Sequence, residues 1–432
     1  MNWELVISEA AVVESYRRLA SNSNRVSVYS AGLAALPDRQ DVLAFSLASP
    51  GRNRGSAVSL VVLGAASRLE LPVRLRDVMR RPPVDTPAVF LVLGVQEAAG
   101  FCAGEVLSWR GPEPLGAVRI LGRGLPVARF TADKDLKDPG PDAPEMWSRS
   151  IGALSEPVWR RLAELRPALF GCGRTGSLMS GALVRSGVRE ITIIDPDRME
   201  LANCGEMDLV TPDDSGRKKS EAVAVALRAI SRSGVAVHEV GENATSFPAV
   251  LAAKDADFLI SCVDNPAARL TVSILSQLFL KPMLDIGTGI LPSRDRGRRM
   301  GADVRLVLPG CCLECLGGLR LGEAATGMRD TGRTEVDWRS QRAGSLRSLN
   351  MVAVGMALRL LEDFLGGAAA GNTWISLNYD GGSPSVSSPS SVPVTDCPIC
   401  SLAGLGDAGL KEVPDLLERL KRGVTVSRQA IA

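Results

Sequence analysis

Histidine is almost absent from this sequence of 432 residues, in which His238 is the only one. A histidine-ligated metal centre needs two or three imidazoles, and a Ser-His-Asp triad would depend on this residue alone, so we set both kinds of site aside. Long apolar runs are also missing. Segments such as Val58–Ala66 stop far short of the ~18 residues that a membrane helix needs. The sequence therefore predicts neither a histidine-based enzyme nor a transmembrane protein.

Net charge is also small, because 50 basic residues stand against 48 acidic ones. Such a chain has no bulk field that gathers nucleic acid or anionic lipid, so we expect no nucleic-acid and no membrane partner. The first residues, MNWELVISEA, lack the basic and apolar segments of a secretory signal, which favours a cytoplasmic location. In that compartment the nine cysteines are expected to be thiols or metal ligands rather than disulfides.

The order of strands and helices predicts two domains. Residues 1–140 mix short apolar strands with helical stretches and end in the polar, linker-like segment at 131–145, which predicts an N-terminal α/β accessory domain. Residues 141–432 form the second domain. There, strands such as PALF and EITIID alternate with amphipathic helices. This alternation predicts an α/β fold with a doubly wound, mostly parallel, Rossmann-like sheet covered on both faces.

A glycine-rich turn, Gly171-Cys172-Gly173-Arg174-Thr175-Gly176, follows the strand PALF and opens a helix. In a GxGxxG turn, the first two glycines permit a tight bend and the close approach of a phosphate, and the third lets the helix pack on the strand. Asp195 ends the next strand, where a carboxylate can bind ribose hydroxyls. These features predict a nucleotide-binding domain, and the alternative is that the glycines only make a tight turn.

Further polar residues follow at the expected carboxyl edge of the sheet, namely Asp197, Asn203, Lys219 and Asp264. A lysine can neutralise phosphate charge, and a strand-end carboxylate can hold Mg²⁺ through its oxygens. A nicotinamide dehydrogenase has no evident need for this set, whereas an enzyme that handles a triphosphate does. An oxidoreductase therefore stays as an alternative that only the glycine turn and Asp195 support.

Two CxxC pairs occupy the C-terminal part of the chain, Cys312 with Cys315 and Cys397 with Cys400. Two such pairs can form a tetrahedral Zn²⁺ site, and four thiolates leave no open position for catalysis, so the zinc would be structural. The alternative is a set of buried or redox-active thiols. Cys311 adjoins the first pair and leaves the ligand register ambiguous.

Taken together, these motifs resemble the ThiF/MoeB/ubiquitin-activating enzyme family, whose members are ATP-dependent adenylyltransferases. They activate the C-terminal carboxylate of ubiquitin-like and sulfur-carrier proteins as an acyl-adenylate. The matching elements occur in family order between Trp147 and Cys400. They are the segments WSRS, FGCGRTGS and DPDRMELAN, followed by Lys219, Asp264 and the CxxC pairs. The resemblance implies an ATP-binding set, namely Gly171, Gly173, Gly176, Asp195, Asp197 and Asn203. It also implies that Lys219 and Asp264 act on the phosphates and Mg²⁺. Arg149 would then reach into the ATP site of a partner subunit.

Two positions depart from the family pattern. Glu206 stands where the family usually has an arginine that contacts phosphate, and it would repel a triphosphate unless it turns away or pairs with Arg217 or Lys218. No cysteine lies between Cys315 and Cys397, where thioester-forming members carry their nucleophile. The acyl group is therefore expected to pass directly to another protein's cysteine or to an amine.

The resemblance further implies a homodimer that uses ATP, Mg²⁺ and structural Zn²⁺, with a ubiquitin-like or sulfur-carrier protein and a conjugating-enzyme-like protein as partners. Residues 1–140 are interpreted as an inactive JAB-like domain or a degenerate adenylation half. Two alternatives stay open. One is a catalytically weak scaffold that binds a ubiquitin-like protein, favoured by Glu206 and the missing cysteine. The other is a peptide-adenylating enzyme, which would use the same site.

Overall fold

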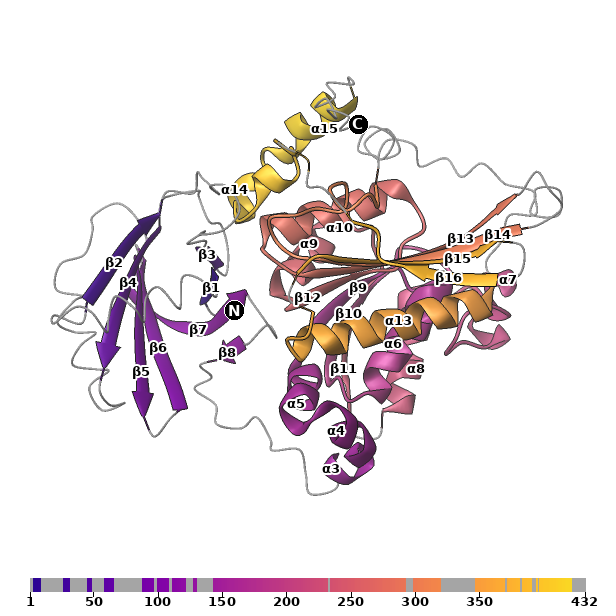
Figure 1. Ribbon diagram of the computed structural model, residues 1–432, viewed down its shortest axis with the longest axis horizontal. Helices are drawn as coiled ribbons and strands as arrows, with labels where there is room; N and C mark the ends of the chain where they lie inside the picture. Colours follow the sequence, from indigo (N-terminus) through magenta and orange to yellow (C-terminus); the bar gives the residue numbers. More distant parts are fainter. Residues whose placement is uncertain are drawn as a thin grey trace. The chain divides into compact units, whose positions relative to one another are not determined.

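The structure is a computed structural model in which the chain divides into two compact units, described separately below (Figure 1). One unit contains Met1–Asp138 and Ala403–Glu412, and the other contains Pro139–Leu402 and Val413–Ala432. The structure describes eight strands before residue 130, and then residues 143–231, 234–292, 298–319, 346–369, 371–380, 383–390, 394 and 396–421.

The first unit contains a sheet whose strands run in the order β2-β4-β5-β6-β7-β1-β3, with β8 paired to β7. Only β4 with β5 and β1 with β7 are parallel among its pairs. The strands are β1 (Trp3–Ser8), β2 (Val26–Ala31), β3 (Phe45–Ala48), β4 (Val58–Ala65), β5 (Ala88–Gln96), β6 (Ala99–Ser108), β7 (Gly111–Leu121) and β8 (Val127–Arg129). The helical stretches expected in residues 1–140 lie outside the described residues.

The second unit is built on a sheet of eight strands in the order β11-β10-β9-β12-β13-β14-β15-β16. The strands from β11 to β13 are parallel, as predicted, whereas β14, β15 and β16 add an antiparallel half, so the whole sheet is mixed. The antiparallel pairing of β13 with β14 follows from the short connection at 293–297, because a parallel crossover needs a dozen or more residues. The strands are β9 (Pro167–Phe170), β10 (Glu190–Ile194), β11 (Ala236–Val240), β12 (Phe258–Ser261), β13 (Met283–Pro292), β14 (Arg298–Val307), β15 (Thr373–Asp380) and β16 (Ser383–Ser387).

Helices cover both faces of this second sheet (Figure 1). Helices α9 and α10 lie on one face, and α6, α8 and α13 lie on the other, where α13 packs on α6 and β14. The helices among the described residues are α3 (Ala143–Met146), α4 (Ser148–Leu154), α5 (Glu156–Glu164), α6 (Arg174–Arg185), α7 (Leu201–Cys204), α8 (Lys219–Ile230), α9 (Phe247–Asp255), α10 (Pro266–Leu278), α13 (Arg347–Leu365), α14 (Gly406–Gly409) and α15 (Val413–Lys421), with 3-10 turns η2 (Pro212–Asp214) and η3 (Cys400–Leu402).

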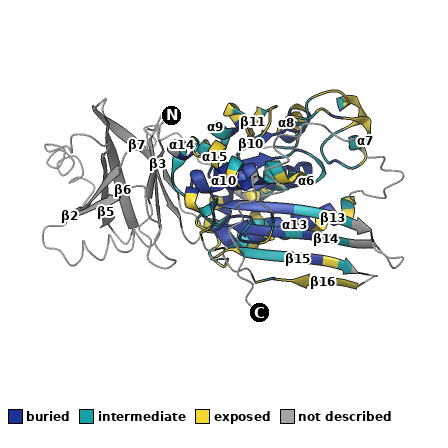
Figure 2. Cartoon of the chain, turned by 90° about the horizontal axis from the view of Figure 1, so that it is seen from above, coloured by how far each residue is buried: buried dark blue, intermediate teal, exposed yellow. Residues whose placement is uncertain are grey.

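The core of this unit is centred on β9 and β12, in which every residue is buried. Central parallel strands are covered on both faces, and for this reason their sequences are almost continuously apolar. The edge strand β16, in contrast, is exposed along its whole length (Figure 2). Among the described residues, no helix combines the length and the apolar character that a membrane span requires.

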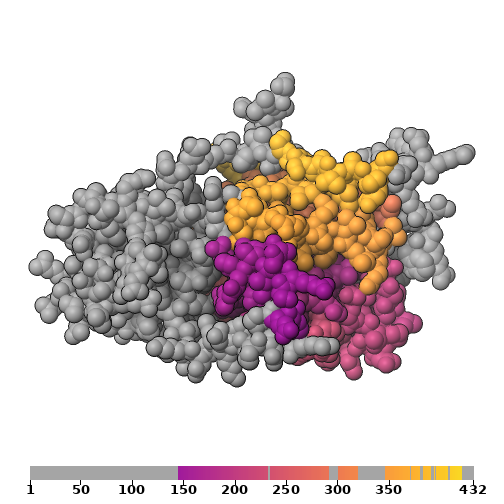
Figure 3. Space-filling model, turned by 60° about the horizontal axis from the view of Figure 1, so that its bottom comes forward, coloured from indigo at the N-terminus to yellow at the C-terminus, as the bar shows by residue number. Residues whose placement is uncertain are grey.

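Two tryptophans attach the segment from α3 to α5 to the rest of the unit. The rings of Trp147 and Trp159 lie 5.5 Å apart, and their indole nitrogens donate to the carbonyls of Arg185 and Ser186 at the C-terminal end of α6. The guanidinium of Arg161 donates to Leu365 at the end of α13. The segment thus lies at the surface beside α13 (Figure 3). Its position is fixed at the end of α6 that lies away from the glycine turn.

Candidate functional site

The glycine turn lies where the strand order of the parallel sheet reverses. The chain leaves β9 for β10 on one side and returns to β12 on the other side. In such sheets, ligands bind in the crevice at the carboxyl ends of the strands on either side of this switch point. A hydrogen bond from Cys262 N to Phe170 O, 2.8 Å long, holds the two segments together just where β9 and β12 end.

The three glycines have different physical roles. At Gly171 the φ angle is +88°, and an added Cβ would lie 2.9 Å from Cys262 O. At Gly176 an added Cβ would lie only 1.8 Å from Gly171 O, so no other residue fits there. At Gly173, by contrast, an added Cβ would have no neighbour within 4 Å. Packing therefore requires the first and third glycines, while the second leaves open space in front of the N-terminus of α6.

The carboxylate of Asp195 stabilises the glycine turn by accepting hydrogen bonds from backbone N–H groups. Its two oxygens accept hydrogen bonds from Cys172 N, at 2.6 Å, and from Asp197 N, at 2.8 Å. Burial raises the pKa of this carboxyl, although the nearby Lys219 ammonium opposes the rise. Asp195 is only 5% exposed, so its first role in the folded chain is to shape the turn. Its binding to ribose stays a prediction.

Lys219, the first residue of α8, faces the same region. Its ammonium lies 2.9 Å from Asp197 Oδ2, and its backbone N–H donates to Asp197 O at 2.8 Å. The neighbouring Lys218 points elsewhere and donates to Gly241 O. The structure therefore brings Lys219 together with Asp197, and through it with Asp195 and the glycine turn.

Asn203 and Glu206 lie in and just after α7. The side-chain oxygen of Asn203 accepts from Glu200 N and so caps this short helix. Glu206 does not form the pairs considered above, because Arg217 is bonded to Asp214 and Lys218 to Gly241. One carboxylate oxygen of Glu206 is buried without a hydrogen-bond partner.

Arg174 is a candidate that the sequence analysis missed. It opens α6 inside the glycine turn, and its Nε is buried with no hydrogen-bond partner. Buried donors are nearly always satisfied, so an unsatisfied guanidinium nitrogen beside an open helix N-terminus fits a site that receives an anion. The signal in the sequence was a basic residue at a variable position of GxGxxG.

Asp264 follows the end of β12 beside the glycine turn, whereas Arg149 lies near the opposite end of α6. Asp264 is exposed in the connection from β12 to α10, directly before Asn265, whose side chain caps α10 by accepting from Ala268 N at 2.7 Å. Arg149 is exposed on α4, which is attached to the C-terminal end of α6. Because α6 is 12 residues long, about 18 Å at ~1.5 Å per residue, Arg149 lies well away from its own glycine turn.

The four predicted cysteines come together. The sulfurs of Cys312, Cys315, Cys397 and Cys400 all lie within 4.8 Å of one another. Individual separations of 3.5 to 3.7 Å are close to the spacing of about 3.8 Å that a tetrahedron of thiolates at ~2.3 Å from Zn²⁺ requires. The Cys311 sulfur instead faces the carbonyl of Cys312 and is not part of the cluster. The ambiguity in register is thus resolved in favour of Cys312, and the donor set fits structural zinc.

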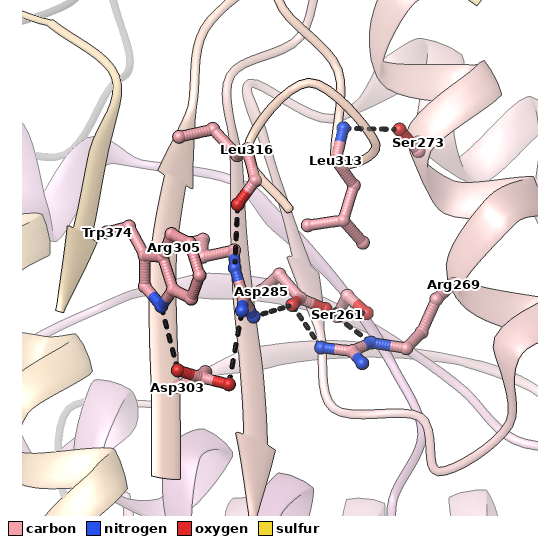
Figure 4. Close-up of polar contacts among 9 residues, drawn as sticks. All are labelled: Ser261, Arg269, Ser273, Asp285, Asp303, Arg305, Leu313, Leu316 and Trp374. Carbon is pink, nitrogen blue, oxygen red and sulfur yellow. Dashed lines mark hydrogen bonds and ion pairs between the residues drawn. The ribbon is translucent and has the colours of Figure 1, made fainter. Parts of the chain in front are cut away.

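A charge network that the sequence analysis did not identify lies where β13, β14 and β15 meet α10 (Figure 4). Asp285 on β13 is fully buried and is contacted by Ser261, Arg269 and Arg305. The guanidinium of Arg305 lies 4.4 Å above the Trp374 ring, pairs with Asp303 and donates to Leu316 O. Burial lowers the pKa of Arg305, opposed by both aspartates. An aspartate inside the apolar strand PMLDIG was the available signal.

The fold and the switch-point turn place this unit among the Rossmann-like α/β proteins. The sequence model of the ThiF family matches residues 147–385, which is more than half of the 432 residues, and the chain belongs to that family. The predicted resemblance is thereby confirmed.

Curated relatives match over a shorter stretch. Ubiquitin-like modifier-activating enzyme 5 of Aedes aegypti is 28% identical over 150 residues, which are 32% of this chain and 37% of that protein. The protein of the same name from Drosophila ananassae is 31% identical over 127 residues, or 27% of this chain and 32% of that protein. The matched stretch thus spans about a third of the length of these relatives.

Among solved structures, E. coli MccB with ATP is similar at a TM-score of 0.46 and 21% identity, covering 59% of this chain and 74% of that one. PaaA is similar at a TM-score of 0.45 and 18% identity, covering 60% of this chain and 85% of that one.

Proposed function

We propose that this chain is an ATP-dependent adenylyltransferase that activates the C-terminal carboxylate of a ubiquitin-like or sulfur-carrier protein. Membership of the ThiF family and the name shared by the curated relatives support the substrate class. The observation that carries the proposal is the open space at Gly173, in front of the α6 N-terminus and among charged groups at the switch point. Such a place suits the phosphates of a nucleotide.

In the proposed reaction, a carboxylate oxygen of the substrate attacks the α-phosphorus of ATP. The bond from that phosphorus to the bridging oxygen breaks, and pyrophosphate leaves. The residues contribute position and charge rather than covalent chemistry. The N–H groups at the start of α6 and the guanidinium of Arg174 face the phosphates, and Lys219 moves from Asp197 toward the developing charge.

Asp264 is the proposed ligand for Mg²⁺, which would neutralise phosphate charge when bound. A carboxylate is a donor that Mg²⁺ accepts, and this one is exposed next to the switch point instead of being used in an internal ion pair. Asp195 is proposed to bind ribose through carboxylate lone pairs that its bonds to Cys172 N and Asp197 N do not use. Asn203 is proposed to bind phosphate through its amide hydrogens, because its side-chain oxygen caps α7.

Arg149 is proposed to serve the ATP site of a second copy in a homodimer. Its place at the far end of α6 from the glycine turn supports this assignment, because an arginine side chain cannot span the length of that helix. Residues 1–140 are proposed to form a separate accessory domain, an inactive JAB-like module or a degenerate adenylation half. The absence of cysteine between Cys315 and Cys397 supports direct transfer of the acyl group to a conjugating partner or an amine.

Glu206 favours a second candidate, a scaffold that binds a ubiquitin-like protein with little turnover. One of its carboxylate oxygens is buried without a hydrogen-bond partner, on a segment whose Asp208 N donates to Ser177 Oγ in the first turn of α6, and a carboxylate there would oppose triphosphate binding. In that case Glu206→Arg should increase nucleotide turnover, whereas an active adenylyltransferase should gain nothing from this change.

Exchange of labelled pyrophosphate into ATP tests the main proposal. It should require both a glycine-ended ubiquitin-like protein and Asp264, so Asp264→Ala should abolish it. Asp255→Ala, at an exposed aspartate ending α9, is the matched control and should exchange normally. Exchange that survives Asp264→Ala, or ATP binding without any exchange over a broad panel of candidates, would contradict the proposal.

A further inference from the structure

One face of α10 is occupied by three polar residues spaced four apart, Arg269, Ser273 and Gln277, which we name the α10 stripe. Side chains four residues apart lie one above another along a helix. Each member of the α10 stripe bonds a group outside its own helix. Ser273 and Gln277 are 1% and 0% exposed, so their polar atoms depend on these partners.

The partners of Ser273 and Gln277 are backbone groups of the cysteine loop. Ser273 Oγ accepts from Leu313 N at 3.2 Å, and Leu313 lies between Cys312 and Cys315 (Figure 4). Gln277 uses both ends of its amide: Nε2 donates to Cys311 O at 2.8 Å, and Oε1 accepts from Gly310 N at 2.9 Å. The loop that carries two of the four thiols is thus fixed to one helix.

Arg269 provides a second route from α10 to the same loop. Its guanidinium is bonded to both oxygens of Asp285. Asp285 also pairs with Arg305, which donates to Leu316 O directly after Cys315. Each of these charged groups is satisfied by the next, so the chain of contacts has little freedom to rearrange.

The other end of α10 lies at the switch point. Asn265 caps the helix, and Asp264 immediately precedes the cap. Between the cap and Gln277 the helix is mostly buried, and every residue of Leu270–Leu278 is buried. A buried, capped helix moves as one body, so a shift of the cysteine loop at one end is transmitted to the turn that carries Asp264 at the other.

We propose that Ser273 and Gln277 are positioning residues that couple metal binding by the four cysteines to the placement of Asp264. The coupling rests on the proposed function, because it acts on the affinity for Mg²⁺ with ATP. Metal on the cysteines would hold the loop, the loop would hold α10, and α10 would set the Asp264 turn. Linkage makes the effect reciprocal: ATP with Mg²⁺ must then strengthen zinc binding by the same factor by which zinc strengthens nucleotide binding.

The test is made on the full chain loaded with zinc. Zinc affinity is measured at equilibrium by competition with a chromogenic chelator, with Mg²⁺ alone and with Mg²⁺ plus saturating ATP. Binding of ATP to the zinc-loaded chain is measured by calorimetry. For the native chain we expect ATP to tighten zinc binding by about fivefold or more, the lower end of common coupling factors.

Ser273→Ala and Ser276→Ala form a matched pair. Both serines are buried on α10, but Ser276 donates to Lys281 O and does not contact the cysteine loop. Ser273→Ala should reduce the effect of ATP on zinc affinity to less than about twofold, whereas Ser276→Ala should keep it. Gln277→Leu should act like Ser273→Ala and also bind zinc more weakly without nucleotide, because it removes the partner of the buried Cys311 carbonyl and of the Gly310 N–H.

The outcomes separate the two proposals. If ATP binds the native chain but does not tighten zinc binding, the coupling is wrong while the proposed function stands. The same holds if Ser273→Ala and Ser276→Ala reduce the coupling equally. If ATP with Mg²⁺ does not bind the zinc-loaded native chain, the proposed function fails and the coupling with it. Circular dichroism establishes that each variant is folded, and Ser273→Ala suffices alone if Gln277→Leu does not fold.

Discussion

The ammonium of Lys219 and the carboxylate of Asp197 form an ion pair 2.9 Å long at the carboxyl edge of the parallel strands. The lysine side chain is 12% exposed and the aspartate side chain 37%, so the pair lies at the boundary between core and solvent. Asp197 thereby keeps a cation at the site before any anion is bound. In the proposed reaction, an entering phosphate would compete with this carboxylate, which suits Lys219 to charge that develops only in the transition state.

Replacing Lys219 with methionine should reduce pyrophosphate exchange by about 100-fold or more, the usual effect of removing a group that stabilises transition-state charge. The melting temperature should change little, because partly exposed ion pairs contribute about 1 kcal/mol or less. Lys218→Met is the control. Its ammonium bonds Gly241 O at 3.0 Å, away from Asp197, so its loss should leave exchange intact. Equal losses in both variants would contradict the assignment.

The glycines of the turn should separate folding from binding. Gly176→Ala should destabilise the domain by several kcal/mol, since its Cβ would lie 1.8 Å from Gly171 O. Gly173→Ala meets no atom within 4 Å and has an ordinary negative φ of −73°, so it should fold normally. It should nevertheless bind ATP at least about tenfold more weakly, because the methyl group would occupy the phosphate space. Urea denaturation and calorimetry measure the two effects, and normal ATP affinity in Gly173→Ala would count against a phosphate there.

Removal of metal from the cysteine cluster should destabilise the second unit, because the four sulfurs join segments 85 residues apart. Cys397→Ser should release zinc and lower the melting temperature, as a chelator should for the native chain. Cys311→Ser should retain one zinc per chain, since the Cys311 sulfur lies outside the cluster. Elemental analysis distinguishes these results. Loss of zinc from Cys311→Ser would show that the ligand register is different.

Asp285 should be more important for stability than the partly exposed Asp303. Asp285→Asn removes a fully buried charge that faces Arg269 and Arg305, and breaking such a buried pair costs about 3–5 kcal/mol. Asp303→Asn should cost about 1 kcal/mol, because this side chain is 37% exposed. Urea unfolding monitored by tryptophan fluorescence compares them, and equal losses would show that burial is not the cause.

The thiol of Cys172 should be unreactive in the folded chain. Burial raises its pKa well above the ordinary value, and the Asp195 carboxylate raises it further. A raised pKa leaves little thiolate at pH 8, so alkylation by iodoacetamide should be slow and should increase only at strongly alkaline pH or on unfolding. Cys204, which is partly exposed, should react first. Peptide mass spectrometry follows both residues. Rapid native labelling of Cys172 would contradict its role as a buried packing group.

Local patterns in the sequence predicted the parallel half of the sheet and the cysteine cluster. The turn at Gly171–Gly176 joins a strand to a helix within a few residues, so its fold depends on neighbours in sequence, and the spacing of Cys312 and Cys315 is equally local. The antiparallel half and the Asp285 network depend on pairings between distant segments. No short pattern reports these, and the unsatisfied nitrogen of Arg174 becomes visible only once its surroundings are packed.

The most direct test of the central claim follows the α-phosphate. The chain is incubated with Mg²⁺, a panel of glycine-ended ubiquitin-like and sulfur-carrier proteins, and ATP labelled at either the α- or the γ-phosphate. We predict that α-label, and not γ-label, becomes attached to one acceptor, that hydroxylamine releases it as expected for an acyl-phosphate anhydride, and that Lys219→Met and Asp264→Ala abolish the attachment. Transfer of γ-label, or α-label that resists hydroxylamine, would contradict carboxylate adenylation.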